Sequence, residues 1–150
     1  MSEESAVRVI PHFTVADAQS AIEFYRKAFG AHELYRLTDP DGRRIGHAEI
    51  EIGGSVMMLN DEYPDFGARC PDTIGGSPVV FFLEVANADA TIERAAQCGA
   101  TVLRPAADQF HGYRSGMVLD PFGYRWSVSH KVEDVTPATM QSRWEAMTDA

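Results

Sequence analysis

The chain has 150 residues, of which 45% are hydrophobic and 23% charged, and this composition indicates a globular rather than a disordered protein. A net charge of −9 at pH 7 repels phosphate backbones and anionic lipids, which argues against nucleic acid as a partner. No apolar run approaches the roughly 20 residues of a membrane span, and the acidic start lacks the features of a signal peptide, so a cytoplasmic protein without membrane contact is expected.

The first half of the chain predicts one strand, one helix and three further strands. VRVIPHFTV (7–15) predicts the first strand, and Asp17 is the expected N-cap of a helix that ends at Gly30. The apolar stripe of this helix consists of Ala18, Ala21, Ile22, Tyr25 and Phe29. The three further strands, separated by the turn DPDG and by a Gly-Gly pair, are predicted at 33–39, 44–52 and 55–60.

The second half predicts the same order of elements. Residues 61–76 are rich in Pro and Gly and form the expected linker or functional flap. A strand is then predicted over 78–85, followed by a helix with Asn87 as cap and Gly99 as stop. The apolar positions of this helix are Ala88, Ile92 and Ala95, and the strands that follow are predicted at 101–105, 116–120 and 124–129.

The tail predicts one more helix, over residues 136–148. Thr136 is its expected cap and Pro137 its first residue. Met140, Trp144 and Met147 share one face, and such a stripe usually serves packing. We interpret the helix as covering a sheet edge or as forming a subunit contact.

The two halves are related by an internal repeat. VADAQSAIE (15–23) aligns with VANADATIE (85–93), and after a one-residue deletion Met58 aligns with Ser127. The sequence therefore predicts an α+β fold made of two βαβββ modules, 7–60 and 77–130, within a single domain over 1–150. Cys70 and Cys98 are too few and too far apart for a disulfide framework or a Cys-rich zinc site.

The closing turn and several flanking stretches resemble a known superfamily. Paired βαβββ modules that end in DPFGYRWS (120–127) resemble the vicinal oxygen chelate superfamily, which includes glyoxalase I, extradiol dioxygenases and bleomycin-resistance proteins. The stretches that resemble its PhnB-like branch are AIEFYRKAFGA (21–31), HAEIEIGGSVMMLND (47–61), GATVLRPAADQF (99–110) and VEDVTP (132–137). The resemblance implies a glyoxalase/bleomycin-resistance fold, in which the modules form a cupped mixed sheet, and a homodimer.

The resemblance also implies where a metal would bind. In metal-dependent members the ligands are His, Gln or Glu side chains on the first and last strand of each module. The corresponding positions here are Ile10, Met58, Val80 and Ser127. None of them is a competent ligand for a divalent ion, so no metal at the usual position and no cofactor are expected. There is also no Gly-rich strand-to-helix turn for a nucleotide cofactor.

Strand alternation predicts which side chains line the concave face. In the first strand Val9, Phe13 and Val15 should pack on helices, which leaves Ile10, His12 and Thr14 on the cavity side. Gly116, Val118, Arg125, Glu51 and Val56 are also expected on that side. The predicted ligand-binding residues, in the cup or at its mouth, are His12, His47, Glu49, Met58, Asn60, Phe82, Phe110, Tyr113, Arg114 and Ser127.

The polar candidates each have more than one interpretation. His12 either contacts ligand or is a hydrogen-bonded core histidine. His47 and Glu49 could act as general base and orienting acid, or hold a divalent metal away from the usual position, or lie on a solvated strand. Arg114 could clamp a carboxylate or phosphate, or pair with an aspartate (Asp108 or Asp120).

These observations leave three functions open. The leading hypothesis is a protein that binds a small molecule in a concave cavity, since Ser127 has no sequence signature of a nucleophile. The alternative is a lyase or isomerase of the vicinal oxygen chelate type with a rearranged site at His12, His47 and Glu49. The third is a structural or regulatory protein that binds a partner through the tail helix.

Overall fold

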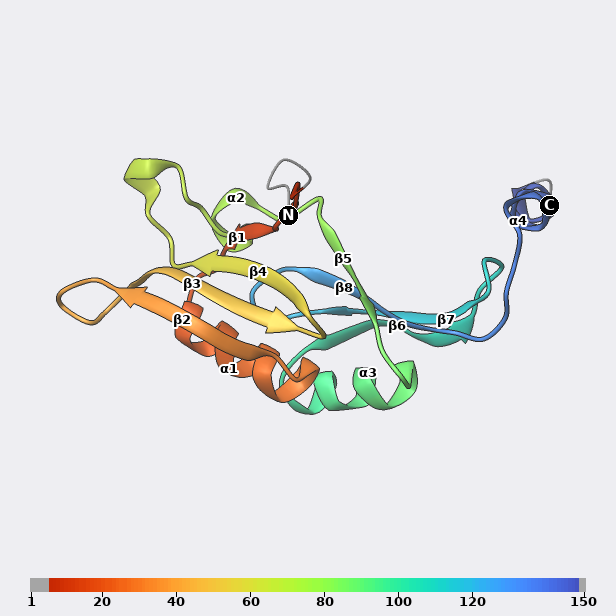
Figure 1. The fold of residues 1–150 in the computed structure, drawn as a ribbon, viewed down its shortest axis with the longest axis horizontal. Coiled ribbons are helices and arrows are strands. Elements are labelled where there is room, and N and C mark those ends of the chain that lie inside the picture. Colours follow the sequence, from red (N-terminus) through yellow and green to blue (C-terminus); the bar gives the residue numbers. More distant parts are fainter. Residues whose placement is uncertain (1–5, 149–150) are drawn as a thin grey trace. The chain divides into compact units, whose positions relative to one another are not determined.

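The computed structural model describes residues 6–148, so the acidic stretch 1–5 considered above lies outside the described part. Contacts divide the chain into two compact units, one ending at Gly76 and the other beginning at Ser77. Each unit contains a four-stranded mixed sheet with a helix on one face (Figure 1). The predicted α+β class with two βαβββ modules and a C-terminal helix is confirmed.

The first unit has its strands in the order β1-β4-β3-β2, with β1 parallel to β4 and the other pairs antiparallel. Its elements are β1 (His12–Thr14), α1 (Ala18–Phe29), β2 (His32–Thr38), β3 (Ile45–Ile52) and β4 (Ser55–Asn60). The strand predicted over 7–15 is therefore much shorter. Pro11 precedes it directly and has no N–H to donate to a ladder, and the side chain of Val9 is 93% exposed, so its predicted burial is wrong.

Helix α1 begins and ends as the sequence predicts. The carboxylate of Asp17 accepts a hydrogen bond from the backbone N–H of Ser20, and Gly30 ends the helix at φ 72°. Four of the five predicted stripe residues are buried, whereas Phe29 is only half-buried. Phe24 is also buried, because its ring packs edge-on against the neighbouring aromatic rings of the same helix.

The segment 61–76, predicted as a linker or flap, folds as part of the first unit. It contains a 3-10 turn, η2 (Pro64–Phe66), and a short helix, α2 (Pro71–Ile74). Asp61 at its start is buried, and its carboxylate accepts the backbone N–H groups of Ala18 and Ile45, both at 2.7 Å. One side chain of this segment therefore joins the start of α1 to the start of β3.

The second unit repeats the topology, with strand order β5-β8-β7-β6 and β5 parallel to β8. Its elements are β5 (Val80–Glu84), α3 (Ala88–Gln97), β6 (Thr101–Asp108), β7 (Tyr113–Leu119), β8 (Arg125–Lys131) and α4 (Pro137–Thr148). β6 continues past Pro105, where its predicted strand ended, because an edge strand tolerates a missing N–H. Both cysteines are free, as predicted.

The internal repeat extends to single hydrogen bonds. Asn87 accepts the N–H of Ala90 as the N-cap of α3, which matches the cap of α1. The first N–H of α3, that of Ala88, donates to Nδ1 of His130 at 2.8 Å. At the start of its helix, His130 thus does in the second unit what Asp61 does at the start of α1. The sequence comparison missed this pair because the two residue types differ.

Helix α4 is confirmed, but it covers little of the rest of its unit. Thr136 caps it by accepting the N–H of Thr139, and none of its residues is buried. It stands away from the sheet of its unit (Figure 1), and the ring of Trp144 lies 5.6 Å from that of Phe110. Arg143 also attaches the helix, because it donates to the Phe110 carbonyl at 3.0 Å and to Glu133 at 2.7 Å. In this unit it does not cover a sheet edge, and the subunit contact stays a prediction. No helix within residues 6–148 is long and apolar enough to span a membrane.

Candidate functional site

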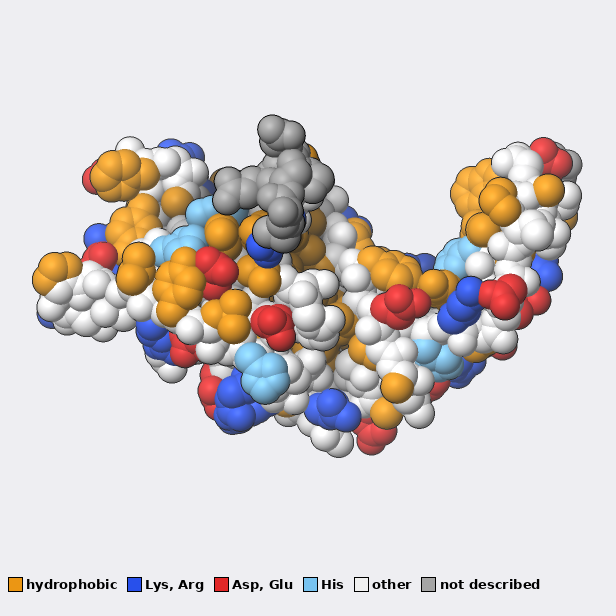
Figure 2. All heavy atoms as spheres, in the orientation of Figure 1, with side chains coloured by type: hydrophobic (Ala, Val, Ile, Leu, Met, Phe, Trp, Pro, Cys, Tyr) orange, Lys and Arg blue, Asp and Glu red, His pale blue; other side chains and the backbone are white. Residues whose placement is uncertain are grey.

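The face of the first sheet that α1 leaves open carries the predicted polar side chains. Phe13, Val15, Ala48, Ile50 and Leu59 are buried on the helix side, as strand alternation requires. The open face carries partly accessible His12, His47, Glu49 and Met58. In Figure 2 pale-blue histidine side chains lie beside hydrophobic ones over this part of the surface. The predicted alternation is thus confirmed for β3, for β4 and for the short strand β1.

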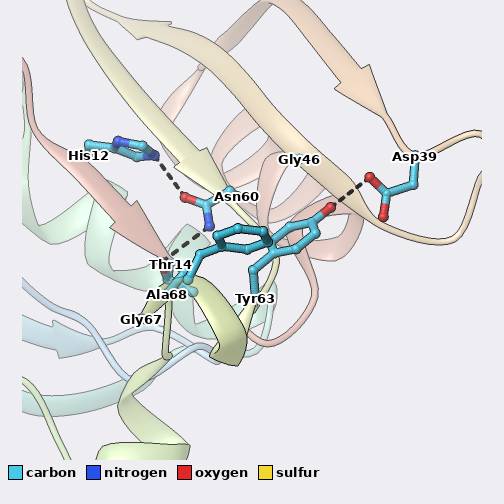
Figure 3. A pocket seen from close by; sticks show the side chains of 9 residues that line it. His12, Thr14, Asp39, Gly46, Asn60, Tyr63, Gly67 and Ala68 are labelled. Carbon is cyan, nitrogen blue, oxygen red and sulfur yellow. Dashed lines mark hydrogen bonds between the residues drawn. The ribbon is translucent and has the colours of Figure 1, made fainter.

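A cavity of about 450 Å³ opens at one end of this face (Figure 3). The sheet contributes residues from β1, β3 and β4, and the segment after β4 closes one side. The cavity is lined by His12, Thr14, Asp39, Gly46, Asn60, Tyr63, Phe66, Gly67 and Ala68. Among the ten predicted ligand-binding residues, His12 and Asn60 line it.

His12 and Asn60 belong to one hydrogen-bonded network. Nε2 of His12 lies 2.8 Å from Oδ1 of Asn60. Nδ2 of Asn60 donates to the backbone carbonyl of Asp61 at 2.7 Å and to Oγ1 of Thr14 at 3.3 Å. Asn60 is buried whereas His12 is exposed, so the buried amide holds an accessible imidazole in place.

The opposite wall is built around Tyr63, which the sequence analysis missed. Its hydroxyl donates to Oδ1 of Asp39 at 3.0 Å, and the guanidinium of Arg44 lies 4.3 Å from its ring centroid. Burial and the bond to Asp39 raise the pKa of Tyr63 above its ordinary value. Gly46 borders the same hydroxyl, since a Cβ at this position would lie 3.4 Å from it. Tyr63 was overlooked because its segment was treated as a connection.

His47 and Glu49 lie beside the cavity rather than in its lining. The ring of His47 meets that of His12 edge-on, with centroids 5.5 Å apart, and lies 5.8 Å from that of Tyr35. The hydroxyl of Tyr35 donates to Oε2 of Glu49 at 2.6 Å, which raises the pKa of Tyr35. Glu49 therefore binds a tyrosine and does not orient His47. Among residues 6–148 no three His, Cys, Asp or Glu side chains are grouped closely enough to hold a metal ion.

The open face of the second sheet brings together three other predicted residues. The rings of Phe82 and Tyr113 lie 5.6 Å apart, and the Tyr113 hydroxyl donates to Oε2 of Glu84 at 3.0 Å. Ser127 takes part in a triangle of hydroxyls with Ser115 and Ser129. Phe110 lies in the β6–β7 turn, against the α4 tryptophan and His111.

The orientation predicted for part of β7 is wrong. Ser115 and Met117 pair with the residues of β8 that face the open side, so Arg114, Gly116 and Val118 face α3. Val118 is fully buried, and a Cβ on Gly116 would lie 2.5 Å from Cδ1 of Ile92 in that helix. The predicted strand there was apolar on both sides, so its alternation was ambiguous.

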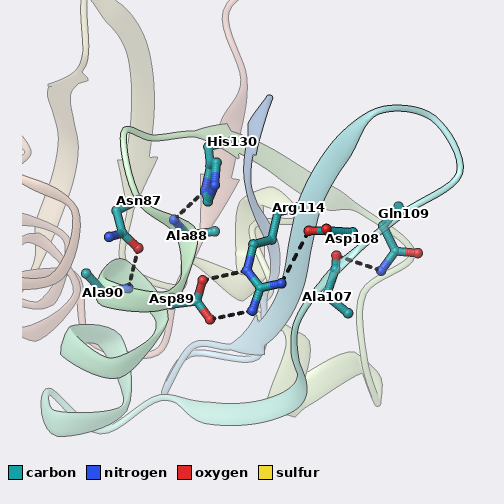
Figure 4. A network of polar contacts seen from close by, with 9 residues as sticks. All are labelled: Asn87, Ala88, Asp89, Ala90, Ala107, Asp108, Gln109, Arg114 and His130. Atoms are coloured by element: carbon teal, nitrogen blue, oxygen red, sulfur yellow. Dashed lines mark hydrogen bonds and ion pairs between the residues drawn. The ribbon is translucent and has the colours of Figure 1, made fainter. Parts of the chain in front are cut away.

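Arg114 is engaged by two carboxylates on the helix side. Asp89 accepts from Nε and Nη2 at 2.7 and 3.0 Å, and Asp108 accepts from Nη1 at 3.2 Å (Figure 4). This hydrogen-bonded pair lowers the pKa of Asp89 below its ordinary value and raises that of the guanidinium. The ion-pair interpretation was thus correct for Asp108. Asp120 instead accepts hydrogen bonds from Phe122, Tyr124 and Trp126, and the ion pair with Asp89 had not been predicted.

Comparison with known proteins places these features in a family context. Residues 9–128 match the family model described as Glyoxalase/Bleomycin resistance protein/Dioxygenase superfamily. The Mycobacterium bovis protein Mb0911c is 43% identical over 142 residues, which cover 93% of each chain. The Arabidopsis thaliana At5g48480 structure has a TM-score of 0.67 at 25% identity, covering 82% of this chain and 98% of its own.

A Bacillus cereus structure shares the fold at lower identity. It is described as a putative 3-demethylubiquinone-9 3-methyltransferase, PhnB protein, and has a TM-score of 0.63 at 14% identity. The match covers 83% of this chain and 99% of that one. This likeness concerns the fold alone.

Proposed function

The chain belongs to the Glyoxalase/Bleomycin resistance protein/Dioxygenase superfamily, and from this premise we propose that it binds a small molecule in the cavity of its first unit. The observation that carries the proposal is the cavity of about 450 Å³, with the His12–Asn60 network on one side and Tyr63 on the other. Concave sites of this size, with aromatic walls and a few fixed polar groups, are typical of small-molecule binding.

The residues at the four positions that correspond to the family's metal ligands support binding without the usual metal. Ile10 and Val80 have no donor atom, and Met58 offers only a thioether, which suits soft metals. Ser127 uses its hydroxyl in the serine triangle. These four residues do not fit a divalent ion held by His and Glu, so no step through such an ion is proposed.

Filling the cavity should weaken binding strongly without unfolding the protein. Gly46→Val adds a side chain beside the Tyr63 hydroxyl, in a strand that favours β-branched residues. We expect the affinity for planar fragments such as indole and phenol to fall about tenfold or more, as misfit groups in pockets commonly cause. Protein-observed NMR titration measures this, with shifts followed at the amides of the cavity lining.

Glu51→Val is the matched control for this experiment. It adds the same side chain to the same strand, at a partly exposed position that does not line the cavity. Its affinities should equal those of the unaltered chain. Equal fragment binding by the Gly46→Val protein, or perturbations confined to the second unit, would contradict the proposed cavity.

The second candidate is a lyase or isomerase with a rearranged site. The edge-on contact of His12 and His47 favours it, because two imidazoles then lie side by side at the mouth of the cavity. Elemental analysis of purified protein, repeated after incubation with nickel, zinc, manganese or iron(II) and desalting, separates the candidates. We expect less than about 0.1 metal per chain, since two neutral imidazoles alone make an incomplete site. About one metal per chain, lost in His12→Ala/His47→Ala, would favour the enzyme.

A further inference from the structure

The direction of the hydrogen bonds around Asn60 is determined by its buried neighbours. Its Nδ2 lies 2.7 Å from the carbonyl oxygen of Asp61, which can only accept, so the amide nitrogen must face that oxygen. The second amide hydrogen points to Oγ1 of Thr14. Oδ1 of Asn60 is consequently the atom that faces His12.

This arrangement selects one tautomer of His12. An amide oxygen has no hydrogen to give, so Nε2 of His12 must carry the proton in the 2.8 Å bond. In the neutral imidazole the other nitrogen, Nδ1, is then unprotonated and accepts hydrogen bonds. Within residues 6–148 Nδ1 of His12 has no hydrogen-bond partner, and the side chain is exposed on the open face.

The other walls of the cavity suit a flat molecule. The rings of Tyr63 and Phe66 contribute aromatic surface, and Gly46, Gly67 and Ala68 leave room beside them. The Tyr63 hydroxyl already donates to Asp39, so both groups present acceptor oxygens. No lysine or arginine is among the described residues that line the cavity.

We propose that Asn60 fixes His12 as a hydrogen-bond acceptor, so that the cavity selects planar aromatic molecules with an N–H or O–H donor. Asn60 acts as a positioning residue and His12 contacts the ligand. This inference rests on the proposed function, because it names the ligand class of the same cavity. A molecule of equal shape without the donor leaves Nδ1 unpaired and loses one neutral hydrogen bond, about fivefold to tenfold in affinity.

Indole and 1-benzofuran test the preference, since they share one shape and only indole has an N–H. Dissociation constants are measured by NMR titration at about pH 8, where an ordinary histidine is neutral. Indole should bind about fivefold to tenfold more tightly than benzofuran. His12→Phe keeps a ring but removes the acceptor, so the difference should vanish. His47→Phe, a neighbour that does not line the cavity, should retain it.

The tautomer is measured without any ligand. The imidazole ¹⁵N spectrum, assigned with the His12→Phe variant, should show Nδ1 at the position of an unprotonated nitrogen and Nε2 at that of a protonated one. Asn60→Leu should give a mixture of tautomers and reduce the preference for indole. Because the first spectrum is recorded on the unaltered chain, the test stands even where the Asn60 variant does not fold.

The outcomes separate this inference from the proposed function. Equal affinity for indole and benzofuran, with both perturbing the cavity amides, would overturn the donor preference and leave binding in place. A protonated Nδ1 in the unaltered chain would do the same. No binding of either molecule would overturn both the preference and the proposed binding of planar ligands.

Discussion

Replacing Asp120 by alanine should lower the free energy of unfolding of the second unit by about 5 kcal/mol, since hydrogen bonds to charged groups contribute about 1.5–3 kcal/mol each. The side chain is 2% exposed, and its carboxylate accepts three N–H groups at 2.9 Å. Two come from the backbone of Phe122 and Tyr124, and the third is the indole of Trp126. Alanine would leave all three donors unpaired.

Urea unfolding followed by tryptophan fluorescence measures this loss, because Trp126 is buried beside the substituted position. The stability of Asp120→Asn should fall between that of the alanine variant and that of the unaltered chain. The amide keeps one acceptor oxygen, but its NH₂ group replaces the second oxygen and cannot accept from an N–H. Asp108→Ala is the control, because its ion pair with Arg114 is exposed and contributes about 1 kcal/mol or less. A loss below about 1 kcal/mol for Asp120→Ala would show that solvent replaces the carboxylate.

Local signals predicted the fold because they agree with its tertiary contacts. Asp17, Asn87 and Gly30 act as caps through bonds within a few residues, which a sequence displays directly. Contacts between distant segments were not visible in this way. The bond from α3 to His130 is one such contact. The pairing of β1 with β4 is another, and it limits β1 to three residues whatever the propensity of its neighbours.

The candidate site was predictable to the extent that strands alternate cleanly. In β3 one side is uniformly apolar, so the placement of His47 and Glu49 on the open face followed from the pattern. In residues 116–119, the part of β7 predicted as a strand, both sides are apolar or small, and the prediction for Arg114 was off by one residue. Tyr63 was missed for another reason, since it lies in the segment expected as a linker or flap, and its bond to distant Asp39 is not visible in the sequence.

Asp61→Ala should destabilise the first unit by about 3 kcal/mol, because two charge-assisted hydrogen bonds are lost and two backbone donors are left unpaired. The Asp61 carboxylate joins the N–H groups of Ala18 and Ile45, each at 2.7 Å, and is 8% exposed. Both tryptophans of the chain lie in the second unit, so fluorescence does not report on this loss. Hydrogen exchange at the Ala18 and Ile45 amides measures the loss of stability instead.

Two further variants show whether the bridge, and not the helix cap, is responsible. Asp17→Ala removes the exposed cap of α1 and should cost about 1 kcal/mol. Asp61→His introduces the residue type that the second unit uses at the equivalent place, where His130 accepts a single N–H. A neutral imidazole has one acceptor nitrogen, so this variant should retain one of the two bonds and lose about half as much as alanine. If alanine and histidine cost the same, the carboxylate contributes through its charge near the helix start, and the two hydrogen bonds are not what joins α1 to β3.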